Sequence, residues 1–127
     1  MISAKLTERG WAGHFICADR CGFRRNTLLE CNGEKVVVST VGNYRPKGPI
    51  NKPQTIGHNR YYETMAFEAK MDDAEEYWEA DVSKEVTFHS PWMIPDLGAM
   101  VDTRADLMHN RVCQEITHQL EAKHNNL

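Results

Sequence analysis

The sequence predicts an α+β fold, a mostly antiparallel five-stranded sheet with one C-terminal helix packed on it. Asn32-Gly33 lies between two apolar runs, which is the strongest short-range signal of a β-hairpin. Alternating apolar and polar residues indicate further strands before residue 89, and apolar residues spaced by three and four after residue 102 indicate a helix. A chain of 127 residues is expected to form a single domain, 1–127.

The composition is that of a globular protein. Hydrophobic residues make up 41% of the chain and charged residues 26%. No apolar run has the length of a signal peptide or of a membrane-spanning helix, so we expect a cytoplasmic protein with no membrane partner. In that compartment the four cysteines are expected to be thiols rather than disulfides.

Residues 1–9 are predicted to be a polar N-terminal lead-in, and three strands are predicted to follow it in the first half of the chain. Alternation predicts a strand over Trp11–Cys17, and a second strand follows over Cys21–Glu30. The turn at Asn32-Gly33 then leads to a third strand, Glu34–Val41. Because this third run is β-branched almost throughout, we expect it at the centre of the sheet.

A long loop over 42–59 separates these strands from the rest. It contains three prolines and several basic residues but no acidic one, and loops of that length are typically functional or disordered. Strands are predicted over Arg60–Ala69 and Tyr77–Phe88. In the first of these we expect the core face to hold Tyr61, Glu63, Met65 and Phe67, which leaves Tyr62 on the wetter face.

The helix is predicted over 102–123, after a proline-rich crossing segment at 89–100. Asp102 or Thr103 is expected to cap its N-terminus. Its buried face is expected to hold Ala105, Met108, Val112, Ile116 and Leu120.

Charge is divided unevenly along the chain, although the net charge is only −3. Residues 20–60 carry eight Lys and Arg against two Glu, whereas residues 61–102 carry two against eleven Asp and Glu. A protein with a basic flank and an acidic flank can dock on copies of itself, so a homo-oligomer is expected. The acidic flank and the pI of about 6.0 argue against long nucleic acid as a partner.

The basic region contains groups suited to a small phosphorylated ligand. Arg24 and Arg25 offer guanidinium forks, and the adjacent Asn26 and Thr27 offer an amide and a hydroxyl for ribose. The alternative is a solvated strand edge that pairs with the acidic strand.

Further ligand-binding groups are predicted around the long loop. Arg45 and Arg60 would contact phosphates, and Tyr62 or Trp92 would stack on a base, with Trp11 as another aromatic candidate. An aromatic stripe is more often core, so Tyr61 is interpreted as packing. No cofactor is predicted.

Metal and enzyme chemistry are less well supported by the sequence. His14, Cys17, Cys21 and Cys31 are possible zinc ligands, but the spacing of the first two on an alternating strand points them to opposite faces, so no metal site is predicted. No nucleophile elbow, P-loop or other motif with a mechanism occurs. We therefore predict that the protein is not an enzyme and has no catalytic residues.

Several strings, among them GWAGHFICADRCGFRRNTLLE, IGHNRYYETMAF, YWEADVSKEV and MHNRVCQEI, resemble a family of small uncharacterised proteins of tailed bacteriophages and prophages. The resemblance runs from Arg9 to the helix, but the loop 44–54 is longer and more basic than in that group. It implies a location in the cytoplasm of the bacterial host. Phage Thoeris anti-defence sponge proteins are similarly small, β-rich and oligomeric, and they sequester cyclic nucleotide or cyclic ADP-ribose signals.

The combined prediction is a phage counter-defence protein. It would bind and sequester a small nucleotide-derived immune signal, of the cyclic oligonucleotide or cyclic ADP-ribose type, without catalysis. The alternative is an inhibitor of a host defence effector, such as an anti-CRISPR-like or nuclease inhibitor, that acts through the acidic surface.

Overall fold

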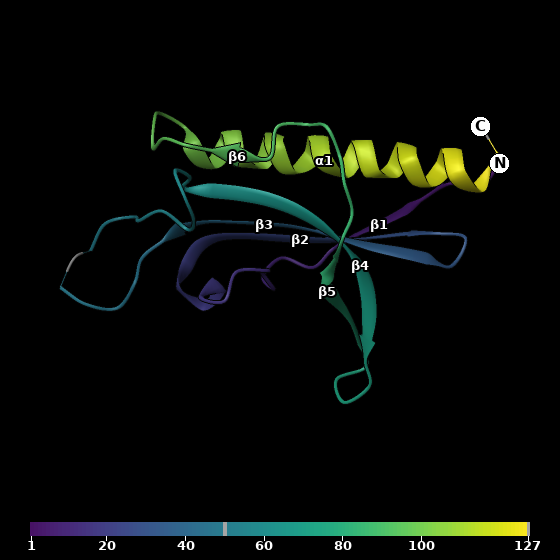
Figure 1. Cartoon of the computed structure of the whole chain (residues 1–127), viewed down its shortest axis with the longest axis horizontal. Coiled ribbons are helices and arrows are strands. Elements are labelled where there is room, and N and C mark those ends of the chain that lie inside the picture. The colour runs from purple at the N-terminus through teal and green to yellow at the C-terminus, as the bar shows by residue number, and fades with distance from the viewer. Residues whose placement is uncertain (50, 127) are drawn as a thin grey trace.

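A computed structural model describes residues 1–49 and 51–126 and confirms the predicted fold class (Figure 1). A five-stranded antiparallel sheet has the order β1-β2-β3-β4-β5, and a short β6 pairs with β4. One α-helix, α1, runs along one face of this sheet. The elements are β1 (Lys5–Glu8), β2 (Cys21–Cys31), β3 (Glu34–Tyr44), β4 (Tyr62–Asp72), β5 (Tyr77–Glu85), β6 (Met93–Ile94) and α1 (Val101–His124).

The hairpin between β2 and β3 is confirmed, with Cys31 opposite Glu34. Asn32 and Gly33 have φ values of 52° and 87°, as the predicted turn requires. β3 lies at the centre of the sheet between β2 and β4, as its β-branched sequence predicted.

The first strand was predicted at the wrong place. Trp11–Cys17 forms a loop, whereas the polar lead-in contains β1, which pairs with β2. Alternation over a few residues does not show whether a strand has a pairing partner. Here the loop is held against the sheet by His14, whose ring bonds to side chains of β3 and β4.

The prediction of which face of β4 lies beneath the helix was wrong. The core beneath α1 contains Tyr62 and Ala66, which belong to the face that was expected to be wetter. Phe67 is buried as well, but on the opposite face, where the ring of His14 covers it at 5.7 Å between centroids. Both faces of β4 are therefore covered, so apolar content alone could not identify the face beneath the helix.

α1 has the predicted buried face. Ala105, Met108, Val112, Ile116 and Leu120 are all buried against β2, β3 and β4. The N-cap residue is Met100 rather than Asp102 or Thr103. Met100 is in the left-handed conformation, and its side chain makes no capping hydrogen bond. Asp102 instead accepts a hydrogen bond from the Tyr62 hydroxyl, which ties the first turn of the helix to the sheet.

The long loop between β3 and β4 is closed at its base, where it returns to the end of β3. Gln54 donates its backbone N–H to the Tyr44 carbonyl at 2.8 Å. Position 50 of the predicted loop lies outside the described residues. Among residues 1–49 and 51–126, no helix has the length and apolar character needed to cross a membrane.

Candidate functional site

The predicted ligand-binding residues do not form one site. Arg24 and Arg25 are consecutive strand residues, so their side chains lie on opposite faces of the sheet. Arg25 bonds to Asn110 of α1 at 2.8 Å, whereas the Arg24 guanidinium lies 5.7 Å over the ring of Trp11. The two guanidiniums therefore cannot hold one phosphate together.

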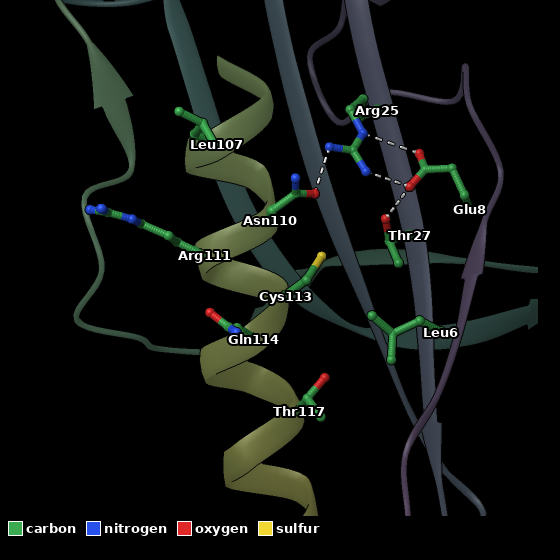
Figure 2. A pocket seen from close by; sticks show the side chains of 10 residues that line it. All are labelled: Leu6, Glu8, Arg25, Thr27, Leu107, Asn110, Arg111, Cys113, Gln114 and Thr117. Atoms are coloured by element: carbon green, nitrogen blue, oxygen red, sulfur yellow. Dashed lines mark hydrogen bonds and ion pairs between the residues drawn. The ribbon is translucent and has the colours of Figure 1, made fainter. Parts of the chain in front are cut away.

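Arg25 and Thr27 line a groove of about 600 Å³ between α1 and the β1–β2 edge (Figure 2). Glu8 accepts bonds at 2.8 Å from both the Arg25 guanidinium and the Thr27 hydroxyl. Burial would raise the pKa of Glu8, but these bonds outweigh it and lower the pKa. Arg111 extends from the far side of the helix, away from Arg25 (Figure 2). The cation predicted to hold phosphate is thus already neutralised by a carboxylate.

Thr27 continues into a buried chain of polar side chains. His109 is fully buried, and its ring nitrogens lie 2.7 Å from the Thr27 hydroxyl and 2.6 Å from the Thr40 hydroxyl. Thr40 in turn lies 2.6 Å from the Thr64 hydroxyl. Burial, and secondarily the charge of Arg25, lowers the pKa of His109 to about 4, so the ring is neutral at pH 7. This chain joins α1 to three strands.

Arg60 is also paired with a carboxylate. Its guanidinium donates to Glu63, whose other oxygen lies 2.8 Å from His14, and the second ring nitrogen of His14 lies 2.9 Å from the Ser39 hydroxyl. Burial would raise the pKa of Glu63, but the bonds from His14 and Arg60 lower it. Ser39 is only 1% exposed, so this Ser-His-Glu arrangement fastens the 9–17 loop to the sheet and does not present a nucleophile to solvent.

Other predicted contacts are engaged inside the fold. Tyr62 is only 2% exposed and packs edge-on against Phe23, so it cannot stack on a ligand. Asn26 is buried, and its amide donates to the Ala12 carbonyl at 2.9 Å. Sequence reasoning placed both residues on accessible faces because it did not predict which segments cover them.

Arg45 lies apart from the other predicted residues, whereas Trp92 and Arg60 line one pocket together. The Arg45 guanidinium bonds to Asn43 and Asn51 within the loop region. Trp92 is 42% exposed, beneath the guanidinium of Arg60 at 5.2 Å.

A cavity of about 490 Å³ lies on the sheet face opposite α1, which we call the open-face cavity. It is formed between the 9–17 loop and β5, and Figure 1 shows the segment before β2 on the side of the strands away from α1. Its walls include Arg9, Trp11, His14, Tyr77, Glu75 and Glu79. Trp11 is 71% exposed, so most of its ring is accessible to a ligand from solvent.

Arg9 is held rigidly in this cavity. Its Nε donates to the Asn26 side chain at 2.8 Å, and its guanidinium carbon lies 4.2 Å over the Tyr77 ring. One terminal nitrogen, Nη2, is buried without a hydrogen-bond partner among the described residues. Burial lowers the pKa of Arg9, although the neighbouring Tyr77 and Glu30 act in the opposite direction. An unpaired buried donor is a costly feature that an acceptor would relieve.

The cysteines do not form a metal site. Among the residues that the structure describes, no three His, Cys, Asp or Glu side chains are grouped so that they could hold an ion. Burial raises the pKa of both Cys21 and Cys113 to about 11, which makes these thiols poor nucleophiles at neutral pH.

Sequence reasoning named Trp11 but missed Arg9, Glu75 and Glu79. The sequence signal that could have pointed to Arg9 was its position two residues before Trp11, in a segment with glycines at 10 and 13. The glycine at 13 lets this segment lie close to the sheet, because a Cβ at that position would lie only 2.6 Å from the side chain of Val41. The carboxylates lie far away in sequence, so only the fold could add them.

Comparison of the chain with protein-family models, curated proteins and solved structures found no match. The resemblance to phage proteins therefore stays a prediction.

Proposed function

We propose that this protein binds a small nucleotide-derived anion in the open-face cavity and does not turn it over. The observation that carries this proposal is the exposed ring of Trp11 beside two arginines, Arg9 and Arg24, neither of which is ion-paired with a carboxylate of the described residues. A volume of about 490 Å³ is in the usual range for small-molecule sites.

Each wall offers a different kind of contact. One face of Trp11 can receive a base, and stacking of this kind contributes about 1–3 kcal/mol. Arg9 lines the cavity, and its unpaired Nη2 can donate to a phosphate oxygen. Arg24 is not one of the lining residues, but its guanidinium lies over the Trp11 ring at 5.7 Å and can donate to a phosphate beside that ring. Glu75 and Glu79 line the same cavity and can accept bonds from ribose hydroxyls.

The same carboxylates favour a small ligand over a long one. Glu79 is only loosely paired, with its oxygen 3.7 Å from Lys70, and the β4–β5 hairpin adds further acidic residues. A nucleic acid strand that crossed the cavity would meet this negative charge, whereas a compact ligand could direct its hydroxyls there.

The absence of turnover is proposed because the most enzyme-like arrangement is buried. Ser39, His14 and Glu63 bond to one another beneath the 9–17 loop. Binding without chemistry is sufficient for sequestration, which is the counter-defence role that the phage resemblance implies.

A thermal-shift screen tests this proposal. Cyclic dinucleotides, cyclic trinucleotides and cyclic ADP-ribose isomers are the probes, and a ligand at a hundredfold its Kd stabilises by about 2.7 kcal/mol. We expect at least one probe to raise the Tm of the wild type, and we expect Trp11→Ala and Arg24→Gln to reduce that shift. Trp92→Ala is the matched control, since Trp92 is exposed but lies outside this cavity. An unchanged shift in Trp11→Ala, or no shift with any probe, contradicts the proposal.

A second candidate function is favoured by the β4–β5 hairpin. Residues 68–85 carry eight Asp and Glu against Lys70 and Lys84, and the hairpin projects away from the rest of the sheet (Figure 1). Such a surface suits a basic partner protein, as an inhibitor of a host effector would require. If no nucleotide shifts the Tm and a purified effector binds with salt-dependent affinity, this function replaces the first.

A further inference from the structure

The open-face cavity has a carboxylate that the sheet holds in place. Glu79 lies on β5, which pairs one-to-one with β4 on both sides of this residue. Tyr77 and Glu79 are alternate residues of the strand, so their side chains lie on the same face. The guanidinium of Arg9 lies 4.2 Å over the Tyr77 ring, so this face is turned toward the 9–17 loop. The Glu79 carboxylate therefore faces the loop that carries Trp11.

This carboxylate is free to accept hydrogen bonds from a ligand. Within the described part of the chain its only ion pair is with Lys70, at 3.7 Å, and both side chains are about half exposed. Exposed pairs of this kind contribute little to stability. Glu75, in the turn before β5, lines the same cavity and has no ion pair among the described residues. The wall formed by β5 thus offers acceptors that the fold itself does not use.

Carboxylate acceptors distinguish the nucleobases by their donors. An ionised carboxylate accepts hydrogen bonds and donates none. Guanine alone has two adjacent donors on its Watson–Crick edge, N1–H and the N2 amino group, and the two oxygens of one carboxylate can accept both. Adenine and cytosine place an amino group beside a ring nitrogen whose lone pair would face the second oxygen. Uracil has a single N–H between two carbonyl oxygens, which the carboxylate would repel.

Trp11 can hold a base while Glu79 reads its edge. The guanidinium of Arg24 lies 5.7 Å over the Trp11 ring, which leaves the other face of the ring for a base. A stacked base presents its edge, rather than its face, to the walls around the ring. Stacking on Trp11 and hydrogen bonding to Glu79 therefore use different parts of the base, and both residues line the same cavity.

We propose that the open-face cavity selects guanine over the other bases, with the base stacked on Trp11 and its N1–H and N2 amino group donating to Glu79. This inference rests on the proposed function and names the class of nucleotide that the cavity takes. Glu75 then remains for a ribose hydroxyl, which every nucleotide carries. Guanine preference comes from Glu79 alone, and the other contacts serve any base.

Isothermal titration calorimetry of the whole chain tests the preference. The probes are three cyclic dinucleotides that carry only guanine, only hypoxanthine or only adenine. We expect guanine to bind about ten- to a hundredfold more tightly than adenine, as is usual for a bidentate contact to a base edge. Hypoxanthine keeps N1–H but lacks the amino group, so its affinity should lie between the two.

Glu79→Gln tests which residue reads the base. A glutamine side chain offers one acceptor and one donor, which match the amino group and ring nitrogen of adenine. We therefore expect this variant to bind the guanine dinucleotide at least about tenfold more weakly and to lose or reverse the preference. Glu75→Gln is the matched control, because it removes the same charge from the same cavity. It should weaken all three dinucleotides by one common factor, and far-UV circular dichroism shows whether both variants are folded.

The outcomes separate this inference from the proposed function. If no dinucleotide, cyclic trinucleotide or cyclic ADP-ribose isomer binds, the proposed function fails and the base preference fails with it. If an adenine ligand binds the wild type as tightly as the guanine dinucleotide, the preference is wrong although the cavity binds nucleotides. This wild-type comparison holds even if a variant does not fold. A guanine preference that persists in folded Glu79→Gln, or that disappears in Glu75→Gln instead, overturns the assignment of Glu79.

Discussion

At the residue scale, the buried polar side chains connect the helix to the sheet and fasten the loop that covers its open face. His109 bonds threonines from two strands, and Glu63 bonds one residue from the 9–17 loop and one before β4. Groups of this kind are costly to bury without partners, so each network stabilises only while it is complete.

The lowered pKa of His109 makes folding stability depend on pH. The unfolded chain binds a proton to this ring near pH 6.5, whereas the folded protein does so only near pH 4. Stability is therefore fully present above pH 6.5 and falls as the pH drops toward 4, by an amount on the order of 3 kcal/mol. Urea denaturation at pH 7, 6 and 5 measures this fall. His109→Gln should be less stable at pH 7 but should lose most of the slope, and an equal slope in both proteins would exclude His109 as its source.

The ion pair between Arg60 and Glu63 leads us to expect a role in stability for Arg60, which the sequence predicted to contact phosphates. The side chain of Glu63 is 7% exposed, so Arg60→Ala leaves a buried carboxylate with one partner fewer. We expect a loss of about 1–3 kcal/mol. Denaturant titration measures it, and the Glu63→Gln background is the control, in which the loss should shrink. A loss that is the same in both backgrounds would show that the pair is not its cause.

At the element scale, the β2–β3 hairpin is defined by its two turn residues. Gly33 has a φ of 87°, and a Cβ added there would meet no atom within 4 Å. Gly33→Ala therefore tests backbone conformation without a steric clash, and we expect about 1 kcal/mol of destabilisation. Thermal unfolding measures it. Gly10 has a similar φ of 81° outside any strand, so Gly10→Ala should cost a similar amount if the strain comes from φ. A harmless Gly33→Ala would mean that the turn tolerates a side chain.

At the scale of the whole molecule, the two ends of the chain hold each other in place. Figure 1 shows the N-terminus beside the last turn of α1, and Asn125 bonds to both the N–H and the carbonyl of Ile2. Asn125→Ala should release residues 2–8 and raise their amide hydrogen exchange about tenfold, with β3 unchanged. Hydrogen exchange with mass spectrometry measures this. Uniform exchange across the sheet would instead show that the edge opens only by global unfolding.

The sequence by itself determined the local geometry. The turn at Asn32-Gly33 depends on the backbone conformations that these two residues favour. The buried face of α1 from Ala105 to Leu120 follows from the helical spacing of apolar residues, which is visible within one short segment. It also located the central strand, because β-branched residues pack well inside a sheet.

Only the tertiary structure decided which charged groups remain available to a ligand. Arg25 meets Glu8 and Asn110, which lie 17 and 85 residues away in the chain, and Arg60 meets a buried Glu63 that also bonds His14. Trp11 and Arg9 gain a cavity only because β5 folds back beside them. These contacts join residues that are far apart in the chain and become neighbours only when the strands assemble. Local sequence patterns do not show which strands will be neighbours.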